Sequence, residues 1–165
     1  MDEIRKKVKD LLKRADVERP PVPIDRIAEM LGLYVRYSPS SDDVSGALIK
    51  QDKEFIVGVN SFHHPNRQRF TIAHEIAHFI LHKDLQVHVD QDFRINRQDG
   101  SNNREEIEAN RFAAELLMPV QLIEHDVSRF SVIDDVALGW LAGRYKVSTQ
   151  AMQIRLTNLG HMAPY

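Results

Sequence analysis

The sequence contains no cysteine among its 165 residues. This absence excludes disulfides, thiol catalysis, iron–sulfur clusters and zinc sites that use cysteine. If the protein binds a metal ion, histidine and carboxylate side chains must therefore hold it.

The sequence also lacks an apolar run long enough to cross a bilayer. Its net charge is −2, which gives no global attraction to nucleic acid or to an anionic membrane. Residues 1–14, MDEIRKKVKDLLKR, carry charges of both signs and no secretory apolar segment. We therefore expect a cytoplasmic protein without membrane association. No repeat or long linker divides the chain, so a single domain over residues 1–165 is expected.

Hydrophobic periodicity predicts an α+β fold: a small antiparallel or mixed sheet packed on a central helix, with a helical C-terminal half. Strands are predicted at 33–38, 46–50 and 55–61. The polar segment RQDGSNN, 97–103, is predicted to be a loop. Helices are predicted at 2–15, 24–31, 67–82, 104–118, 120–127, 133–144 and 148–159.

The central helix carries the pattern H-E-x-x-H at His74, Glu75 and His78. Residues four apart share one face of a helix, so the two imidazoles can converge on a single zinc ion. Glu75 is placed to contact a water bound to the metal and to take its proton. The alternative is that core partners satisfy both histidines. The polarity of this buried face favours the metal site.

The third ligand must come from elsewhere. His82 continues the four-residue spacing, but three ligands along one straight helix would span about 12 Å. His82 is therefore expected to cap the helix or to hold a ligand in place. Asp84 occupies a position that is a ligand in some zinc peptidases, but the glycine that such a turn requires is replaced by Leu81.

A carboxylate from the helix at 104–118 is the other route. Its apolar stripe places Glu105 and Glu106 on the inward face, and periodicity cannot decide between them. Asn110 follows Glu106 by one helical turn, well placed to hydrogen-bond a ligand. Glu108 and Glu115 are expected on the polar side.

The segments RQRFTIAHEIAHFILH (67–82) and EIEANRFAAELLMP (106–119) resemble the ImmA/IrrE family of bacterial and phage metallopeptidases. The resemblance extends over residues 22–157 and implies a zincin-like fold with one gluzincin-type zinc ion per chain. It selects Glu106 as the third ligand beside His74 and His78, with Glu75 as the catalytic base. It also implies a protein substrate, a helix-turn-helix transcriptional repressor cut at a specific site in stress response or mobile-element regulation.

Two alternatives are a DNA-binding regulator and a toxin–antitoxin component with a structural or sensory zinc. Residues 141–160 resemble a helix-turn-helix, but their only cations are Arg144, Lys146 and Arg155. That is too few for strong phosphate binding, so direct DNA binding is disfavoured. The intact Glu75 argues against a purely structural zinc.

Two further features bear on catalysis. The strand FIVGVNS, 55–61, is a candidate sheet edge to which an extended substrate could add; an ordinary core strand is equally compatible. A donor that stabilises the transition state is not identifiable. His125, Tyr145, Tyr34 and Tyr37 are candidates, and for each a structural role is favoured.

Overall fold

The computed structural model describes residues 2–83, 87–90 and 100–164. The chain divides into two units. The sheet unit is Pro23–Ala113, and the helical unit combines Met1–Val22 with Ala114–Tyr165. None of the described helices is long and apolar enough to cross a membrane.

The sheet unit contains β1 (Leu33–Ser38), β2 (Gly46–Gln51), β3 (Glu54–Asn60) and β4 (Val87–Asp90), in the spatial order β1-β3-β2-β4. β1 pairs with β3 in parallel, whereas β2 is antiparallel to both β3 and β4. Asp52 adopts a φ of 56° in the turn between β2 and β3, a conformation that aspartate tolerates in tight hairpins. Leu48 of β2 and Val57 and Val59 of β3 lie on one face of the sheet and are buried in the core.

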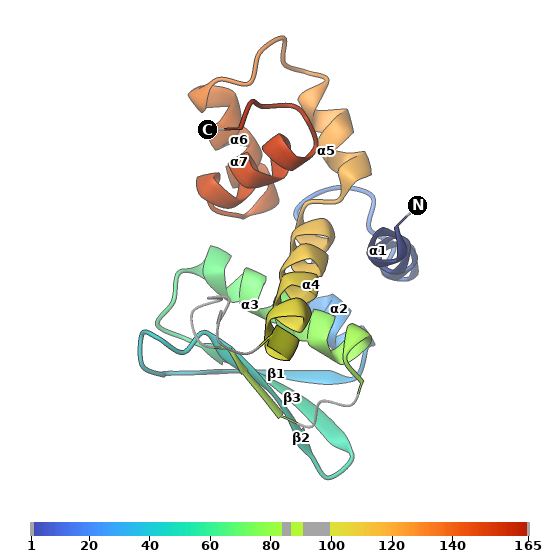
Figure 1. Cartoon of the computed structure of the whole chain (residues 1–165), viewed down its shortest axis with the longest axis vertical. Coiled ribbons are helices and arrows are strands. Elements are labelled where there is room, and N and C mark those ends of the chain that lie inside the picture. The colour runs from blue at the N-terminus through green and yellow to red at the C-terminus, as the bar shows by residue number, and fades with distance from the viewer. Residues whose placement is uncertain (1, 84–86, 91–99, 165) are drawn as a thin grey trace. The chain divides into compact units, whose positions relative to one another are not determined.

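Helix α3 (Pro65–Leu81) lies over one face of this sheet, beside α2 (Ile24–Met30), as Figure 1 shows. Pro65 opens α3, and the His64 ring accepts a hydrogen bond from the Asn66 amide at 3.0 Å. Toward its other end, Phe79 packs edge-to-face on Phe55 of β3, with ring centroids 5.0 Å apart. The middle of α3, from Thr71 to His78, is entirely buried.

Helix α4 (Gly100–Leu117) runs from the sheet unit into the helical unit. The other helices of the helical unit are α1 (Glu3–Arg14), α5 (Val120–Val127), α6 (Asp135–Tyr145) and α7 (Thr149–Asn158). Two buried charges organise this unit. Arg155 bonds to the Glu115 carboxylate and to the Met118 carbonyl oxygen. Asp126 accepts hydrogen bonds from Arg144 at 2.7 Å and from Tyr145 at 2.9 Å.

The α+β class is confirmed, as are the predicted helices and strands within a few residues. Three predictions are wrong. Glu115, expected on the polar side of α4, is buried and pairs with Arg155. The strand at 55–61 is not an edge, because β3 pairs with β1 on one side and β2 on the other. The predicted loop at 97–103 is wrong for its last four residues, since α4 begins at Gly100; residues 97–99 lie outside the described part of the chain.

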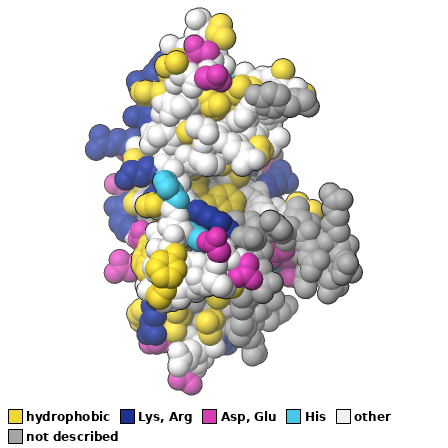
Figure 2. All heavy atoms as spheres, turned by 90° about the vertical axis from the view of Figure 1, so that its left-hand side faces the viewer, with side chains coloured by type: hydrophobic (Ala, Val, Ile, Leu, Met, Phe, Trp, Pro, Cys, Tyr) yellow, Lys and Arg dark blue, Asp and Glu magenta, His cyan; other side chains and the backbone are white. Residues whose placement is uncertain are grey.

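On the face shown in Figure 2, hydrophobic side chains are scattered among charged and polar ones. The most exposed large hydrophobic residues, Val136 and Phe62, are 80% and 76% exposed and belong to different units.

Candidate metal centre

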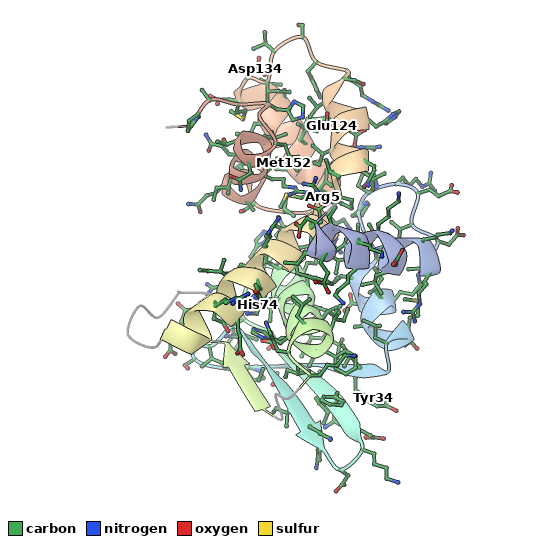
Figure 3. The ribbon with its side chains drawn as sticks, turned by 45° about the vertical axis from the view of Figure 1, so that its right-hand side comes forward. Arg5, Tyr34, His74, Glu124, Asp134 and Met152 are labelled. Atoms are coloured by element: carbon green, nitrogen blue, oxygen red, sulfur yellow. The ribbon has the colours of Figure 1, made fainter. Side chains whose placement is uncertain are left out.

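Two histidines of α3 occupy consecutive turns of its buried face. The side chains of His74 and His78 are fully buried, and their ring centroids lie 4.7 Å apart. Figure 3 shows His74 on α3, directed toward α4. The Nε2 atoms of the two rings are 3.1 Å apart, as expected for residues four apart on one helical face.

Glu106 of α4 supplies the carboxylate that faces both rings. Its Oε2 lies 3.1 Å from Nε2 of His74, and its Oε1 lies 3.1 Å from Nε2 of His78. Ligand atoms of these three residues all lie within 4.8 Å of one another. Of the two glutamates that periodicity leaves open, Glu106 is thus the one whose carboxylate reaches both histidines.

The other nitrogen of each ring is held by a neighbour. Nδ1 of His74 lies 2.9 Å from Oδ1 of Asn110 on α4, an acceptor, so Nδ1 carries the proton. Nδ1 of His78 lies 2.9 Å from Nδ1 of His82, whose Nε2 is 3.3 Å from Glu108. When Nε2–H of His82 donates a hydrogen bond to Glu108, Nδ1 of His82 is unprotonated and accepts a hydrogen bond from Nδ1–H of His78. Both ligand-side Nε2 atoms then present lone pairs.

This donor set fits a zinc ion. Two nitrogens each about 2.0–2.1 Å from a tetrahedral zinc would be about 3.3 Å apart, close to the observed 3.1 Å. Two nitrogen lone pairs and a carboxylate gathered in a buried site repel one another unless a cation lies between them. Two histidines and one glutamate leave a fourth position for water, as in catalytic rather than structural zinc sites.

Glu75 follows His74 directly on α3, and its side chain is fully buried. That Glu75 is the base, and that His74, His78 and Glu106 are the ligands, stays a prediction. The geometry specifies the ligand atoms for this prediction: Nε2 of both histidines and the Glu106 carboxylate oxygens. Asp84, the other candidate ligand, lies outside the described residues.

All four candidates for a transition-state donor lie in the described residues, and His125 is exposed in the last turn of α5. Tyr145 is buried in the helical unit and donates to Asp126, and Tyr37 donates to Asp25 at 2.9 Å. Tyr34 lies with Tyr37 beside a pocket formed by α2 and β1. The tyrosine hydroxyls at 37 and 145 therefore have structural partners.

Sequence reasoning missed the part played by Glu108. Periodicity predicts Glu108 on the polar side of α4, whereas its carboxylate contacts His82 at 3.3 Å and Arg104 at 3.1 Å. The hydrogen bond with His82, followed by that with Arg104, lowers the pKa of the Glu108 carboxyl. The sequence feature that could have revealed this contact is His82, the third histidine at four-residue spacing, which needs a hydrogen-bond partner of its own at the end of α3.

Comparison with known proteins identifies the family. The family described as the IrrE N-terminal-like domain matches residues 28–157. The chain belongs to this family.

Two curated relatives support the assignment to the IrrE family. The chain is 39% identical to the radiation response metalloprotease IrrE of Deinococcus deserti over 95 residues, which is 56% of this chain and 32% of that protein. It is 36% identical to the IrrE protein of Deinococcus radiodurans over 104 residues, 62% of this chain and 30% of that protein. The chain thus spans about a third of the length of these relatives.

A solved structure shows the same fold. It is described as a Mycobacterium tuberculosis transcriptional regulator and is similar with a TM-score of 0.67, covering 95% of this chain and 56% of that chain. The sequence identity is 15%, so the likeness concerns the fold alone.

Proposed function

We propose that this member of the IrrE family is a zinc-dependent endopeptidase with a zincin-like site. The observation that carries the proposal is the triangle formed by Nε2 of His74, Nε2 of His78 and the Glu106 carboxylate, with 3.1 Å along each side. The two relatives named as metalloproteases add support.

In this mechanism, His74, His78 and Glu106 would hold one zinc ion, and Glu75 would be the catalytic base. When bound, zinc polarises a carbonyl group and lowers the pKa of water toward ~7. Glu75 accepts a proton from the attacking water and delivers it to the leaving amine nitrogen. Asn110 and His82 keep the proton of each ligand ring on Nδ1, so that Nε2 remains unprotonated.

The substrate we propose is a helix-turn-helix repressor, cut at one site in the cytoplasm. This rests on the family resemblance, and the helical unit weakens the DNA-binding alternative. Arg155 is buried against Glu115, and Arg144 bonds to Asp126. Of the three cations in residues 141–160, Lys146 is the one with an exposed side chain and no ion pair among the described residues.

The test separates metal binding from catalysis. Metal analysis of the purified chain should give one zinc per molecule, and His78→Ala should abolish it. Glu75→Gln should keep the zinc but lose cleavage of a helix-turn-helix repressor encoded beside this gene. Glu54→Gln makes the same chemical change at an exposed position of the sheet unit and should leave cleavage intact. Absence of zinc affinity would refute the site, whereas activity surviving in Glu75→Gln would refute only the base.

A further inference from the structure

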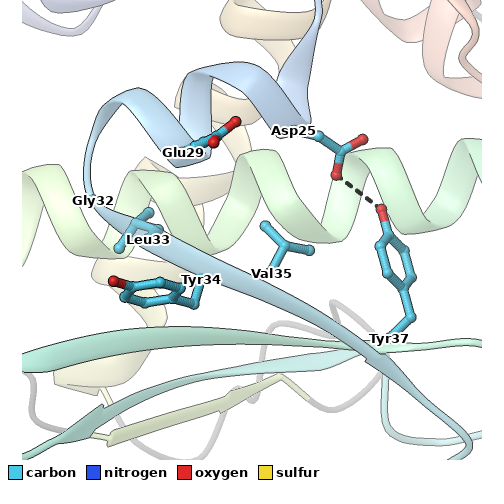
Figure 4. A pocket seen from close by; sticks show the side chains of 7 residues that line it. All are labelled: Asp25, Glu29, Gly32, Leu33, Tyr34, Val35 and Tyr37. Carbon is cyan, nitrogen blue, oxygen red and sulfur yellow. Dashed lines mark hydrogen bonds between the residues drawn. The ribbon is translucent and has the colours of Figure 1, made fainter.

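A pocket of about 510 Å³ lies between α2 and β1 in the sheet unit (Figure 4). Its volume is in the range of small-ligand sites. Its lining combines two carboxylates, two aromatic rings and two aliphatic side chains: Asp25, Glu29, Leu33, Tyr34, Val35 and Tyr37. None of these residues is a candidate zinc ligand or base, so the pocket is not part of the metal centre.

The charge of the lining is negative. Asp25 accepts a hydrogen bond from the Tyr37 hydroxyl at 2.9 Å and interacts with Arg69, a largely buried residue of α3 outside the lining. Glu29 is exposed, and its carboxylate has no hydrogen-bond or ion-pair partner in the part of the chain that the structure describes. A cation entering the pocket would therefore meet one carboxylate that is uncompensated and a second that is partly compensated.

The rings of Tyr34 and Tyr37 also favour an arginine or lysine side chain as the ligand. Tyr34 is 53% exposed and Tyr37 is 49% exposed, high values for residues of a strand. Arginine and lysine side chains combine an apolar stem with a charged head, and they pack on tyrosine faces through cation–π contact. Val35, which is partly exposed, provides apolar surface that such a stem would cover.

The pocket also borders the edge of the sheet. β1 has a strand neighbour on one side only, β3, so in the described sheet the opposite row of backbone N–H and C=O groups faces outward. An extended peptide can add to such an edge by main-chain hydrogen bonds, with alternate side chains entering neighbouring pockets. The segment Leu33–Ser38 offers six residues for this pairing.

We propose that β1 and this pocket form a docking site for an extended protein segment whose arginine or lysine side chain enters the pocket and pairs with Glu29. The main chain of the segment pairs with β1, and the cation satisfies Glu29. The site goes beyond the peptidase function and requires neither zinc nor Glu75.

The experiment uses the full chain carrying Glu75→Gln, without added metal and with ¹⁵N label. The probe is a seven-residue peptide of threonine and valine with one central arginine. The control peptide carries citrulline, an uncharged isostere of arginine, at the central position. The arginine peptide should shift the amide signals of residues 32–38 saturably. Citrulline should weaken binding about five-fold or more, because each partly exposed charge pair contributes about two- to five-fold.

Two variants give the matched control. Glu29→Gln should weaken the arginine peptide about two- to five-fold and leave the citrulline peptide unchanged. Glu54→Gln removes an exposed carboxylate that does not line the pocket and should change neither peptide. The same titrations are repeated on the wild-type chain in the presence of a chelator, in case Glu75→Gln disturbs the fold.

Three results would overturn the docking site: no saturable shift at millimolar peptide, shifts centred outside β1 and α2, or equal affinity for the arginine and citrulline peptides. Because no step of this assay uses zinc or cleavage, a failed docking site leaves the zinc proposal standing, and a failed zinc site leaves the docking site standing.

Discussion

At the scale of single residues, the candidate centre depends on which nitrogen of each imidazole carries the proton. Asn110 and His82 occupy the Nδ1 sides of His74 and His78, each at 2.9 Å. These contacts fix ring orientation and direct the Nε2 lone pairs toward Glu106. Without them, each ring could rotate or carry its proton on the nitrogen that must bind metal.

Replacing Asn110 with alanine should therefore weaken zinc binding about 10- to 100-fold, because the His74 ring loses its acceptor. Asn110→Asp keeps an acceptor oxygen at the same place and should retain most of the affinity. A competition titration against a chromophoric chelator measures both variants. Equal affinities for wild type and Asn110→Ala would show that the contact does not position His74.

Tyr37 provides a prediction on pH. Burial, followed by its hydrogen bond to Asp25, raises the pKa of the phenol from 10.0 to about 12, while Arg69 acts in the opposite direction. Since the folded-state pKa is raised, the stabilisation from Tyr37 is present in full below pH 10 and is lost as the pH rises from 10 to about 12.

Urea unfolding of wild type and Tyr37→Phe at pH 8, 9.5 and 11 tests this sign. The stability difference between the two proteins should be constant at the lower two pH values and smaller at pH 11. Comparing matched proteins removes the effect of the other titrating groups. A difference that stays constant through pH 11 would contradict the raised pKa.

Sequence reasoning at this scale had a clear limit on α4. Periodicity narrows the third ligand to Glu105 and Glu106, because both adjoin the apolar stripe. Which of these two adjacent side chains faces α3 depends on how α4 packs, and periodicity does not show that. The same uncertainty affected Glu115, which was assigned to the polar side. Its side chain is in fact 6% exposed and pairs with Arg155, forty residues later along the chain. A partner this distant leaves no local signal.

At the scale of elements, the close approach of α3 to the sheet depends on Gly46 at the start of β2. A Cβ atom at this position would lie 2.3 Å from Cγ2 of Thr71 on α3 and 2.6 Å from the backbone oxygen of Gly58. A side-chain movement could relieve the first clash, but the second involves the backbone of β3. Gly46 thus lets β2 pair with β3 while α3 lies directly above.

Gly46→Ala should therefore destabilise the protein by about 1–3 kcal/mol, the usual cost of overpacking a core. Gly58→Ala is the matched control on β3, because its Cβ would meet its nearest neighbours only at 3.8 and 4.0 Å. Chemical denaturation of both variants measures the effect. A loss of stability in Gly58→Ala as large as in Gly46→Ala would show that a general glycine effect, not the contact with α3, is responsible.

Elements were easier to predict than their arrangement. Alternating and continuous apolar runs located β1, β2 and β3, because strand formation follows local pattern. The order of the strands depends on non-local pairing, so the sequence could not show that β3 is central or that β4 pairs with β2. β4 and the first turn of α4 lie in a polar stretch with little periodicity, so the local pattern predicts neither of them.

For the whole molecule, metal binding and stability should be linked. The candidate ligands join two helices of the sheet unit, with His74 and His78 on α3 and Glu106 on α4. An ion that binds them stabilises the folded state over the unfolded chain, where these positions are far apart. It also relieves the repulsion among a carboxylate and two lone pairs gathered in a buried site.

Zinc at 100 times its dissociation constant adds about 2.7 kcal/mol of stability, which corresponds to a rise of about 5–10 °C in the melting temperature for a chain of this size. A chelator should reverse the rise, and hydrogen exchange should show increased protection in α3 and in α4 up to residue 113. His78→Ala removes one ligand from the same site, so its melting temperature should not respond to zinc. If wild type and His78→Ala gained equal stability, the zinc would be binding elsewhere, and His74, His78 and Glu106 would not form the metal centre.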